Sequence, residues 1–208
     1  MALYVNYGCG YGDETCAPEG WLNFDASPTL RIQRIPLIGR LAPAPFPATA
    51  RFGDIRKGLP VADGSADGVY CSHVLEHLAL EDFRNALKNT FRILRPGGVF
   101  RLVLPDLKLL AREYVASDKP DAAVQFMAAS NMGRPWRPKG LMGLVRSWLG
   151  NSEHQWMWDY PALAMELEKA GFVSTRPAVL GDSGDVMFAK VESENRWNGA
   201  LGMQTQRP

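Results

Sequence analysis

The clearest structural signal lies between residues 67 and 104, which read DGVYCSHVLEHLALEDFRNALKNTFRILRPGGVFRLVL. The apolar run at residues 69–71 predicts a buried strand, and the apolar residues after it recur at spacings of three and four, which predicts one face of a helix. These residues are Leu80, Phe83, Leu87, Phe91 and Leu94. Arg95-Pro96-Gly97-Gly98 ends the helix, and the near-continuous apolar run at 99–104 is typical of a parallel strand covered on both faces. Strand, helix and strand in this order predict a βαβ unit.

Further elements flank this unit on both sides. Upstream we predict strands at 3–7, 21–24 and 50–53 and a short helix that begins at Pro28 and is stopped by Pro36. Downstream we predict helices at 107–117 and 161–170, then strands at 172–175 and 186–189 around a turn at 182–185. Strands alternating with helices predict a doubly wound α/β fold. We expect one domain over residues 1–191 and a polar, poorly ordered tail over 192–208.

The stretch from 118 to 160 lacks clear helical periodicity and concentrates tryptophans and cations. It contains Trp136, Trp148, Trp156 and Trp158 together with Arg134, Arg137, Lys139 and Arg146. We predict an insertion that closes over a substrate as a lid. A solvated loop with its tryptophans turned inward is the alternative, and nucleic-acid binding is disfavoured.

Composition limits the partners. The 208 residues carry 23 Lys and Arg against 22 Asp and Glu, so a net charge of +1 supplies no general attraction to nucleic acid or an anionic membrane. No apolar run approaches the roughly 18 residues of a membrane span, and the N-terminus has no basic region typical of a secretory signal. The three cysteines form no CxxC pair, which favours reduced thiols. We therefore expect a cytoplasmic protein without a nucleic-acid or membrane partner, and the oligomeric state is left open.

Glycines follow the first predicted strand as Gly8, Gly10 and Gly12. Glycines at this place let backbone N–H groups approach a ligand at the carboxyl edge of the sheet. A dinucleotide fingerprint would need its third glycine at position 13, which is Asp13, and no Walker A lysine follows. A glycine-rich turn without a ligand is the alternative reading.

Acidic residues follow the next two strands. Asp25 ends the second, where a carboxylate can accept hydrogen bonds from ribose hydroxyls, and Asp54 with Ile55 ends the third, where they can hold an adenine. Residues 59–77 read LPVADGSADGVYCSHVLEH. With these features the sequence resembles the class I S-adenosylmethionine-dependent methyltransferases, and within them the type 11 group, whose run is LPFxDxSFDxVxxxHVLEH.

The resemblance implies a Rossmann-like sheet of seven mostly parallel strands with the last one antiparallel, and S-adenosyl-L-methionine as cofactor. It implies cofactor-binding residues at Asn6, Tyr7, Gly8, Cys9, Gly10, Asp25, Ala26, Asp54, Ile55, Ser72 and His73. Two departures stand out. Asn6 replaces the usual acidic residue, and the segment 13–20, which contains Pro18, is too short for the usual first helix.

Three residues are predicted to be catalytic. His73 follows the fourth strand and Asp106 the fifth, and His154 lies in the predicted lid, where its ordinary pKa near 6.5 suits a general base. The alternatives are a structural role for His154 and a helix cap for Asp106. A metal site at His73 and His77 is disfavoured because the sequence shows no third ligand, so we expect no metal.

The resemblance implies methyl transfer from S-adenosylmethionine to a small-molecule hydroxyl, amine or carboxyl group, with a glycan precursor among the candidates. A cofactor-binding or scaffold protein of the same fold without turnover is the alternative, motivated by Asn6 and the shortened first helix. An aminopropyl transferase is disfavoured because Ser72-His73 stands where an acidic pair would bind a polyamine.

Overall fold

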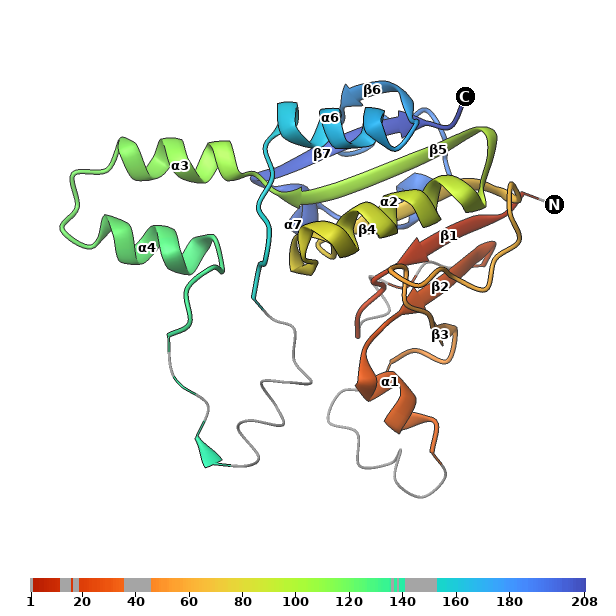
Figure 1. Ribbon diagram of the computed structural model, residues 1–208, viewed down its shortest axis with the longest axis horizontal. Coiled ribbons are helices and arrows are strands. Elements are labelled where there is room, and N and C mark those ends of the chain that lie inside the picture. Colours follow the sequence, from red (N-terminus) through yellow and green to blue (C-terminus); the bar gives the residue numbers. More distant parts are fainter. Residues whose placement is uncertain are drawn as a thin grey trace.

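A computed structural model describes residues 2–11, 16, 19–35, 46–135, 137, 139–140 and 153–208. Seven strands form one sheet in the order β3-β2-β1-β4-β5-β7-β6, as Figure 1 shows. The strands are β1 (Tyr4–Tyr7), β2 (Trp21–Asp25), β3 (Ala50–Phe52), β4 (Ala66–Ser72), β5 (Leu94–Pro105), β6 (Val173–Pro177) and β7 (Ala200–Gln206). Strands β1 to β5 pair in parallel, and β7 runs antiparallel to both β5 and β6. The predicted fold class, including the antiparallel last strand, is confirmed.

Helices cover the sheet and extend beyond it (Figure 1). They are α1 (Pro28–Gln33), α2 (Leu80–Ile93), α3 (Leu107–Val115), α4 (Ala122–Ala129), α6 (Tyr160–Lys169) and α7 (Glu194–Trp197), with 3-10 turns η2 (Leu75–His77) and η3 (Phe188–Lys190). Helices α3 and α4 form a pair that projects from the carboxyl end of β5. In the part of the chain that the structure describes, no helix is long and apolar enough to cross a bilayer.

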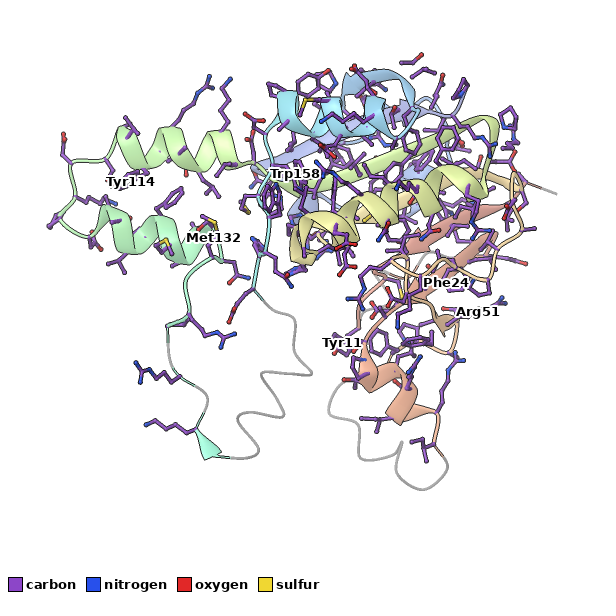
Figure 2. All side chains as sticks on the ribbon, in the orientation of Figure 1. Tyr11, Phe24, Arg51, Tyr114, Met132 and Trp158 are labelled. Carbon is purple, nitrogen blue, oxygen red and sulfur yellow. The ribbon has the colours of Figure 1, made fainter. Side chains whose placement is uncertain are left out.

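The sheet has a hydrophobic core on each face. One core packs α2 and α6 against the central strands, and Figure 2 shows Phe24 and Trp158 within the body of the protein. Trp158 stacks on Phe83 of α2 with ring centroids 4.2 Å apart. The other core packs Phe188 and Trp197 of the C-terminal segment against the opposite face. The apolar stripe that predicted α2 is thus the side of the helix that packs on the sheet.

The predicted tail at 192–208 is wrong, and so is the predicted strand at 186–189. Residues 200–206 form β7, which lies between β5 and β6 and is largely buried, while residues 188–190 form the 3-10 turn η3. The polar residues at the end of β7 are part of the sheet, and Thr205 is fully buried with its hydroxyl bonded to that of Thr175. The folded unit therefore extends at least to Gln206.

Arg101 of β5 explains how this C-terminal segment is held. Its side chain is fully buried, and its guanidinium donates to Glu192, Asp182 and Gln204 at 2.6 to 2.8 Å. It also lies over the Trp197 ring, 4.8 Å from the ring centroid. A buried charge is stable only when its donors are satisfied, so this arginine fixes the segment against the sheet.

Candidate functional site

The glycine loop turns sharply where β1 ends. Gly8 and Gly10 have positive φ values of 79° and 67°, in the left-handed region that favours glycine. The Gly8 N–H donates to the Phe24 carbonyl of β2 at 2.8 Å. A Cβ added to Gly8 would lie 1.9 Å from Cγ2 of Val74, so the loop passes directly against the segment that follows β4.

Asp25 ties this loop to the end of β2. Its Oδ2 accepts from the Gly10 N–H at 3.1 Å and its Oδ1 from the Ser27 N–H at 2.8 Å, and Ala26 beside it is exposed. Burial raises the pKa of Asp25, while the two backbone hydrogen bonds oppose this shift. A carboxylate has about four acceptor positions, so Asp25 retains capacity for ribose hydroxyls. The loop and this carboxylate fit the predicted cofactor.

Three other predicted cofactor residues direct their side chains into the interior. The Asn6 side-chain amide donates to the side-chain Oδ1 of Asn23 at 3.1 Å, and the Tyr7 hydroxyl lies 3.2 Å from that of Thr90. Cys9 is buried in a small core beneath the loop. Their predicted contacts with a cofactor would therefore come from the backbone.

The adenine residues predicted at the end of β3 have partners within the protein. Asp54 forms an ion pair with Arg56 at 2.8 Å. Burial alone would raise the pKa of Asp54, but the hydrogen bonds and charge of Arg56 outweigh it and lower the pKa. Ile55 is buried in the main core. The adenine-binding role of both residues stays a prediction.

The C-terminal segment reaches the end of β4 through Arg196. Its guanidinium donates to the Ser72 carbonyl at 2.6 Å and to the Ser72 hydroxyl at 3.2 Å. His73 adopts a positive φ of 54°, and its Nε2 lies 2.8 Å from the Arg196 carbonyl. The predicted site residues Ser72 and His73 are thus both held by a residue that the sequence reasoning had placed in a tail.

The three predicted catalytic residues line one pocket. A cavity of about 370 Å³ at the carboxyl ends of β4 and β5 is bordered by His73, Asp106 and His154. Ala128 near the end of α4 and Asn131 after it complete another wall. Residues far apart in the sequence therefore meet where open α/β sheets bind their ligands.

Asp106 and His154 both have structural contacts in this pocket. Asp106 caps α3, because its Oδ1 accepts from the N–H groups of Lys108 and Leu109 at 2.8 and 3.2 Å. His154 Nδ1 lies 2.7 Å from the Ser130 carbonyl. Burial lowers the pKa of His154, although the charge of Glu76 opposes this shift. The predicted cap is confirmed, and the catalytic roles of both residues stay predictions.

The predicted lid is described only in part. Helix α4 and residues 130–135 belong to it, whereas Trp136, Trp148 and Arg146 lie outside the described residues. The two ends of the intervening segment meet, since the His154 N–H donates to the Asn131 carbonyl at 3.1 Å. Both of these residues line the pocket, and the closing role of the segment stays a prediction.

Sequence reasoning missed two residues at this site. Arg196 lay in a polar stretch without a motif. Glu76 stands between Leu75 and His77 in η2, and the structure buries it completely beside the pocket. Its position within HVLEH was the available signal, because a carboxylate next to a histidine after a buried strand is a candidate site residue.

Comparisons with known proteins agree with the family resemblance and with the fold. Residues 5–102 match the type 11 family model described as "Methyltransferase domain". Over 68 residues the chain is 43% identical to the O-methyltransferase resE of Aspergillus sclerotiorum, a match that covers 33% of this chain and 23% of that protein. The matched stretch thus spans about a quarter of that relative's length.

Solved structures share the fold at low identity. A SAM-dependent methyltransferase from Thermotoga maritima has a TM-score of 0.53 and 15% identity, covering 100% of this chain and 83% of that one. One from Archaeoglobus fulgidus has a TM-score of 0.51 and 15% identity, covering 99% and 86%. At these identities the structures are evidence for the fold alone.

Proposed function

Because this chain carries a class I S-adenosylmethionine-dependent methyltransferase domain, we propose that it transfers a methyl group to a small molecule through a hydroxyl, amine or carboxyl group. The observation that carries the proposal is that one pocket is bordered by His73, Asp106 and His154 together. The similarity to an O-methyltransferase favours an oxygen acceptor within this range.

The pocket residues have limited chemistry to perform. When bound, the cofactor supplies a methyl group already activated as a sulfonium, so the protein positions the acceptor, excludes water and takes up a proton. In this proposal the loop at Gly8 and Gly10 holds the methionine end through backbone N–H groups. Asp25 accepts hydrogen bonds from the ribose, close to the loop that it already fixes.

Two groups bordering the pocket suit the role of proton acceptor. The Nδ1 of His154 faces the Ser130 carbonyl, an acceptor, so Nδ1 carries the proton and Nε2 carries a lone pair. Asp106 presents a carboxylate on the same rim. Either one accepts the proton from a hydroxyl or ammonium acceptor placed between them in the pocket.

Replacing Asp25 with alanine tests the cofactor site. We expect the affinity for S-adenosylhomocysteine, measured by calorimetry, to fall by about 1 to 3 kcal/mol, because hydrogen bonds to a charged group contribute about that much. Asp25 also holds Gly10 and Ser27, so we expect the variant to lose roughly 1 kcal/mol of unfolding free energy as well. Asp63→Ala is the matched control, since this exposed carboxylate pairs with Arg92.

Cofactor binding and stability of the two variants together show whether the end of β2 holds the cofactor. Unchanged binding in Asp25→Ala would show that the cofactor does not use the end of β2. Binding that is lost in both Asp25→Ala and Asp63→Ala would trace to general destabilisation, which the urea midpoint of each variant reports. Binding of the product without methyl transfer to any acceptor in a panel of hydroxyl, amine and carboxyl compounds would support the alternative of a scaffold without turnover.

A further inference from the structure

Glu76 is a buried acid without a compensating donor. Its side chain is 1% exposed, and within the described ranges neither carboxylate oxygen has a hydrogen-bond partner. Burying an ionised carboxylate is costly unless a donor, a cation or a proton accompanies it. The side chains around Glu76 therefore indicate what compensates the negative charge of its carboxylate.

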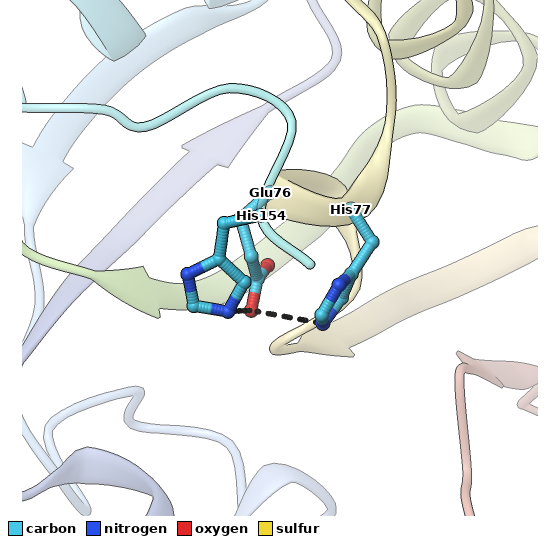
Figure 3. A group of neighbouring side chains, drawn as sticks. All are labelled: Glu76, His77 and His154. Carbon is cyan, nitrogen blue, oxygen red and sulfur yellow. Dashed lines mark ion pairs between the residues drawn. The ribbon is translucent and has the colours of Figure 1, made fainter. Parts of the chain in front are cut away.

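All three histidines of the chain surround this carboxylate (Figure 3 shows two of them with Glu76). From Glu76 Oε1 the distances are 3.5 Å to His73 Nδ1, 3.8 Å to His77 Nε2 and 3.9 Å to His154 Nε2. Glu76 and His77 come from η2, and His154 comes from the segment before α6. The fold thus gathers three imidazoles and one carboxylate from two distant parts of the sequence.

The second ring nitrogen of each histidine determines what the first one presents. In every case it faces a backbone carbonyl, which only accepts hydrogen bonds, so that nitrogen must carry the ring proton. These contacts are His73 Nε2 to Arg196 O at 2.8 Å, His77 Nδ1 to Glu153 O at 3.1 Å, and His154 Nδ1 to Ser130 O at 2.7 Å. In the neutral rings, the nitrogens directed at Glu76 then present lone pairs. Lone pairs that converge on a carboxylate attract a cation.

We propose that Glu76, His77 and His154 bind one divalent transition-metal ion, with His73 as a further ligand. Imidazole nitrogens and a carboxylate are the donor set of catalytic zinc sites, and each histidine already donates its other N–H to a carbonyl, as metal-bound histidines do. The ligand atoms of the first three residues lie within 4.8 Å of one another. Bonds of about 2.0 to 2.1 Å require them to approach to roughly 3.4 Å, which small side-chain rotations provide.

This inference revises the expectation that no metal is bound. That expectation depended on the absence of a third ligand beside His73 and His77, and His154 is such a ligand although it lies 77 residues after His77 in the chain. His73 and His154 also border the acceptor pocket, so the ion would have an open position toward it. Resting on the proposed function, this selects an acceptor with an oxygen ligand, because bound Zn²⁺ lowers the pKa of a hydroxyl. With the lone pair of His154 Nε2 bound to the ion, Asp106 on the pocket rim is left as the proton acceptor.

Zn²⁺ is the probe for the test. The tag-free chain is dialysed against EDTA and then titrated with Zn²⁺ in a calorimeter, and S-adenosylhomocysteine binding is measured on the same sample. We expect one equivalent of Zn²⁺ per chain and an affinity that Glu76→Gln lowers by about 100-fold. Glu166→Gln is the matched control, since this buried glutamate pairs with Arg84 and Lys169 away from the cluster, and it should leave Zn²⁺ binding unchanged.

Histidine NMR gives a second readout that does not depend on activity. Because the chain has only three histidines, its imidazole ¹⁵N signals report on this cluster alone. Zn²⁺ should shift Nε2 of His77 and His154 while their Nδ1 nitrogens stay protonated. Should Glu76→Gln fail to fold, the half-buried His77→Asn serves in its place with the same expected loss.

The outcomes separate this inference from the proposed function. A chain that binds S-adenosylhomocysteine but no Zn²⁺ overturns the metal site and leaves the methyltransferase proposal in place. Zn²⁺ binding without S-adenosylhomocysteine binding supports the metal site and contradicts the cofactor site. Zn²⁺ binding that is equally tight in the wild type and in both ligand variants also overturns the metal site, because the ion then binds elsewhere.

Discussion

Replacing Gly8 with alanine tests the contact between the glycine loop and the segment after β4. The added Cβ would lie 1.9 Å from Val74 Cγ2 and 3.2 Å from Val74 Cβ, at a backbone φ of 79°. The left-handed conformation costs an alanine about 1 to 2 kcal/mol, and the overlap with Val74 adds about 1 to 3 kcal/mol. We therefore expect Gly8→Ala to lower the free energy of unfolding by roughly 2 to 5 kcal/mol.

Three further variants separate the two contributions. In Gly8→Ala with Val74→Ala, the Cγ2 overlap is removed, so only the conformational cost of about 1 to 2 kcal/mol should remain beyond that of Val74→Ala alone. Gly181→Ala is the matched control, because Gly181 has a φ of 78° and the described residues place no atom within 4 Å of an added Cβ. This control should also cost about 1 to 2 kcal/mol.

Urea unfolding of the five proteins measures these differences, and calorimetry with S-adenosylhomocysteine follows the loop itself. Affinity should fall in Gly8→Ala, because the displaced loop carries the N–H groups proposed to meet the cofactor, and it should partly return when Val74 is also alanine. If the Gly8 and Val74 substitutions add within about 0.5 kcal/mol, the close approach of the loop to Val74 is refuted.

Two other predictions concern charged side chains. Arg101→Leu leaves the buried Glu192 without its cationic partner and should lower the unfolding free energy by about 3 to 5 kcal/mol. The exposed Arg95→Leu should cost less than about 1 kcal/mol, and equal losses in urea unfolding would contradict this prediction. Hydrogen bonds from Arg84 lower the pKa of Glu166 to about 2, below its ordinary value of 4.5. The lowered pKa means that ionised Glu166 stabilises the folded state above pH 4.5, and this contribution is lost as pH falls toward 2. The unfolding free energies of the wild type and Glu166→Gln should therefore converge over that range by about 2 kcal/mol, a value reduced for the solvent around Arg84. A constant difference from pH 5 to pH 2 would show that the pair is not formed.

The spacing of apolar residues made the βαβ unit of β4, α2 and β5 predictable from the sequence. The spacing of the apolar residues from Leu80 to Leu94 required a helix with one buried face, and the apolar run before Pro105 required a strand covered on both sides. These signals are local, so no knowledge of distant contacts was needed. The antiparallel seventh strand followed from the family resemblance, which did not identify residues 200–206 as its sequence.

Long-range pairing limited the rest of the prediction. Arg101 looked like an isolated charge in an apolar run, because its partners Glu192 and Gln204 are about a hundred residues away in sequence. In the same way, His73 and His154 were recognised as site residues one by one, but their common neighbour Glu76 became visible only when the fold brought them together. Residues whose role depends on a distant partner carry little signal in a single sequence.

The position of β7 has a consequence for how the nascent chain acquires its structure. In the described part of the molecule, β6 pairs only with β7, so the outermost strand has no place in the sheet until residues 200–206 have been synthesised. The guanidinium of Arg101 likewise cannot form its hydrogen bonds until Glu192 and Gln204 have been synthesised. Parallel pairing of β1 to β5 can proceed while residues 106–199 are still being translated, whereas β6 and β7 join the sheet only after residues 200–206 have been synthesised. The order of synthesis is therefore not the order of assembly, because residues 200–206 insert between two strands that were synthesised before them.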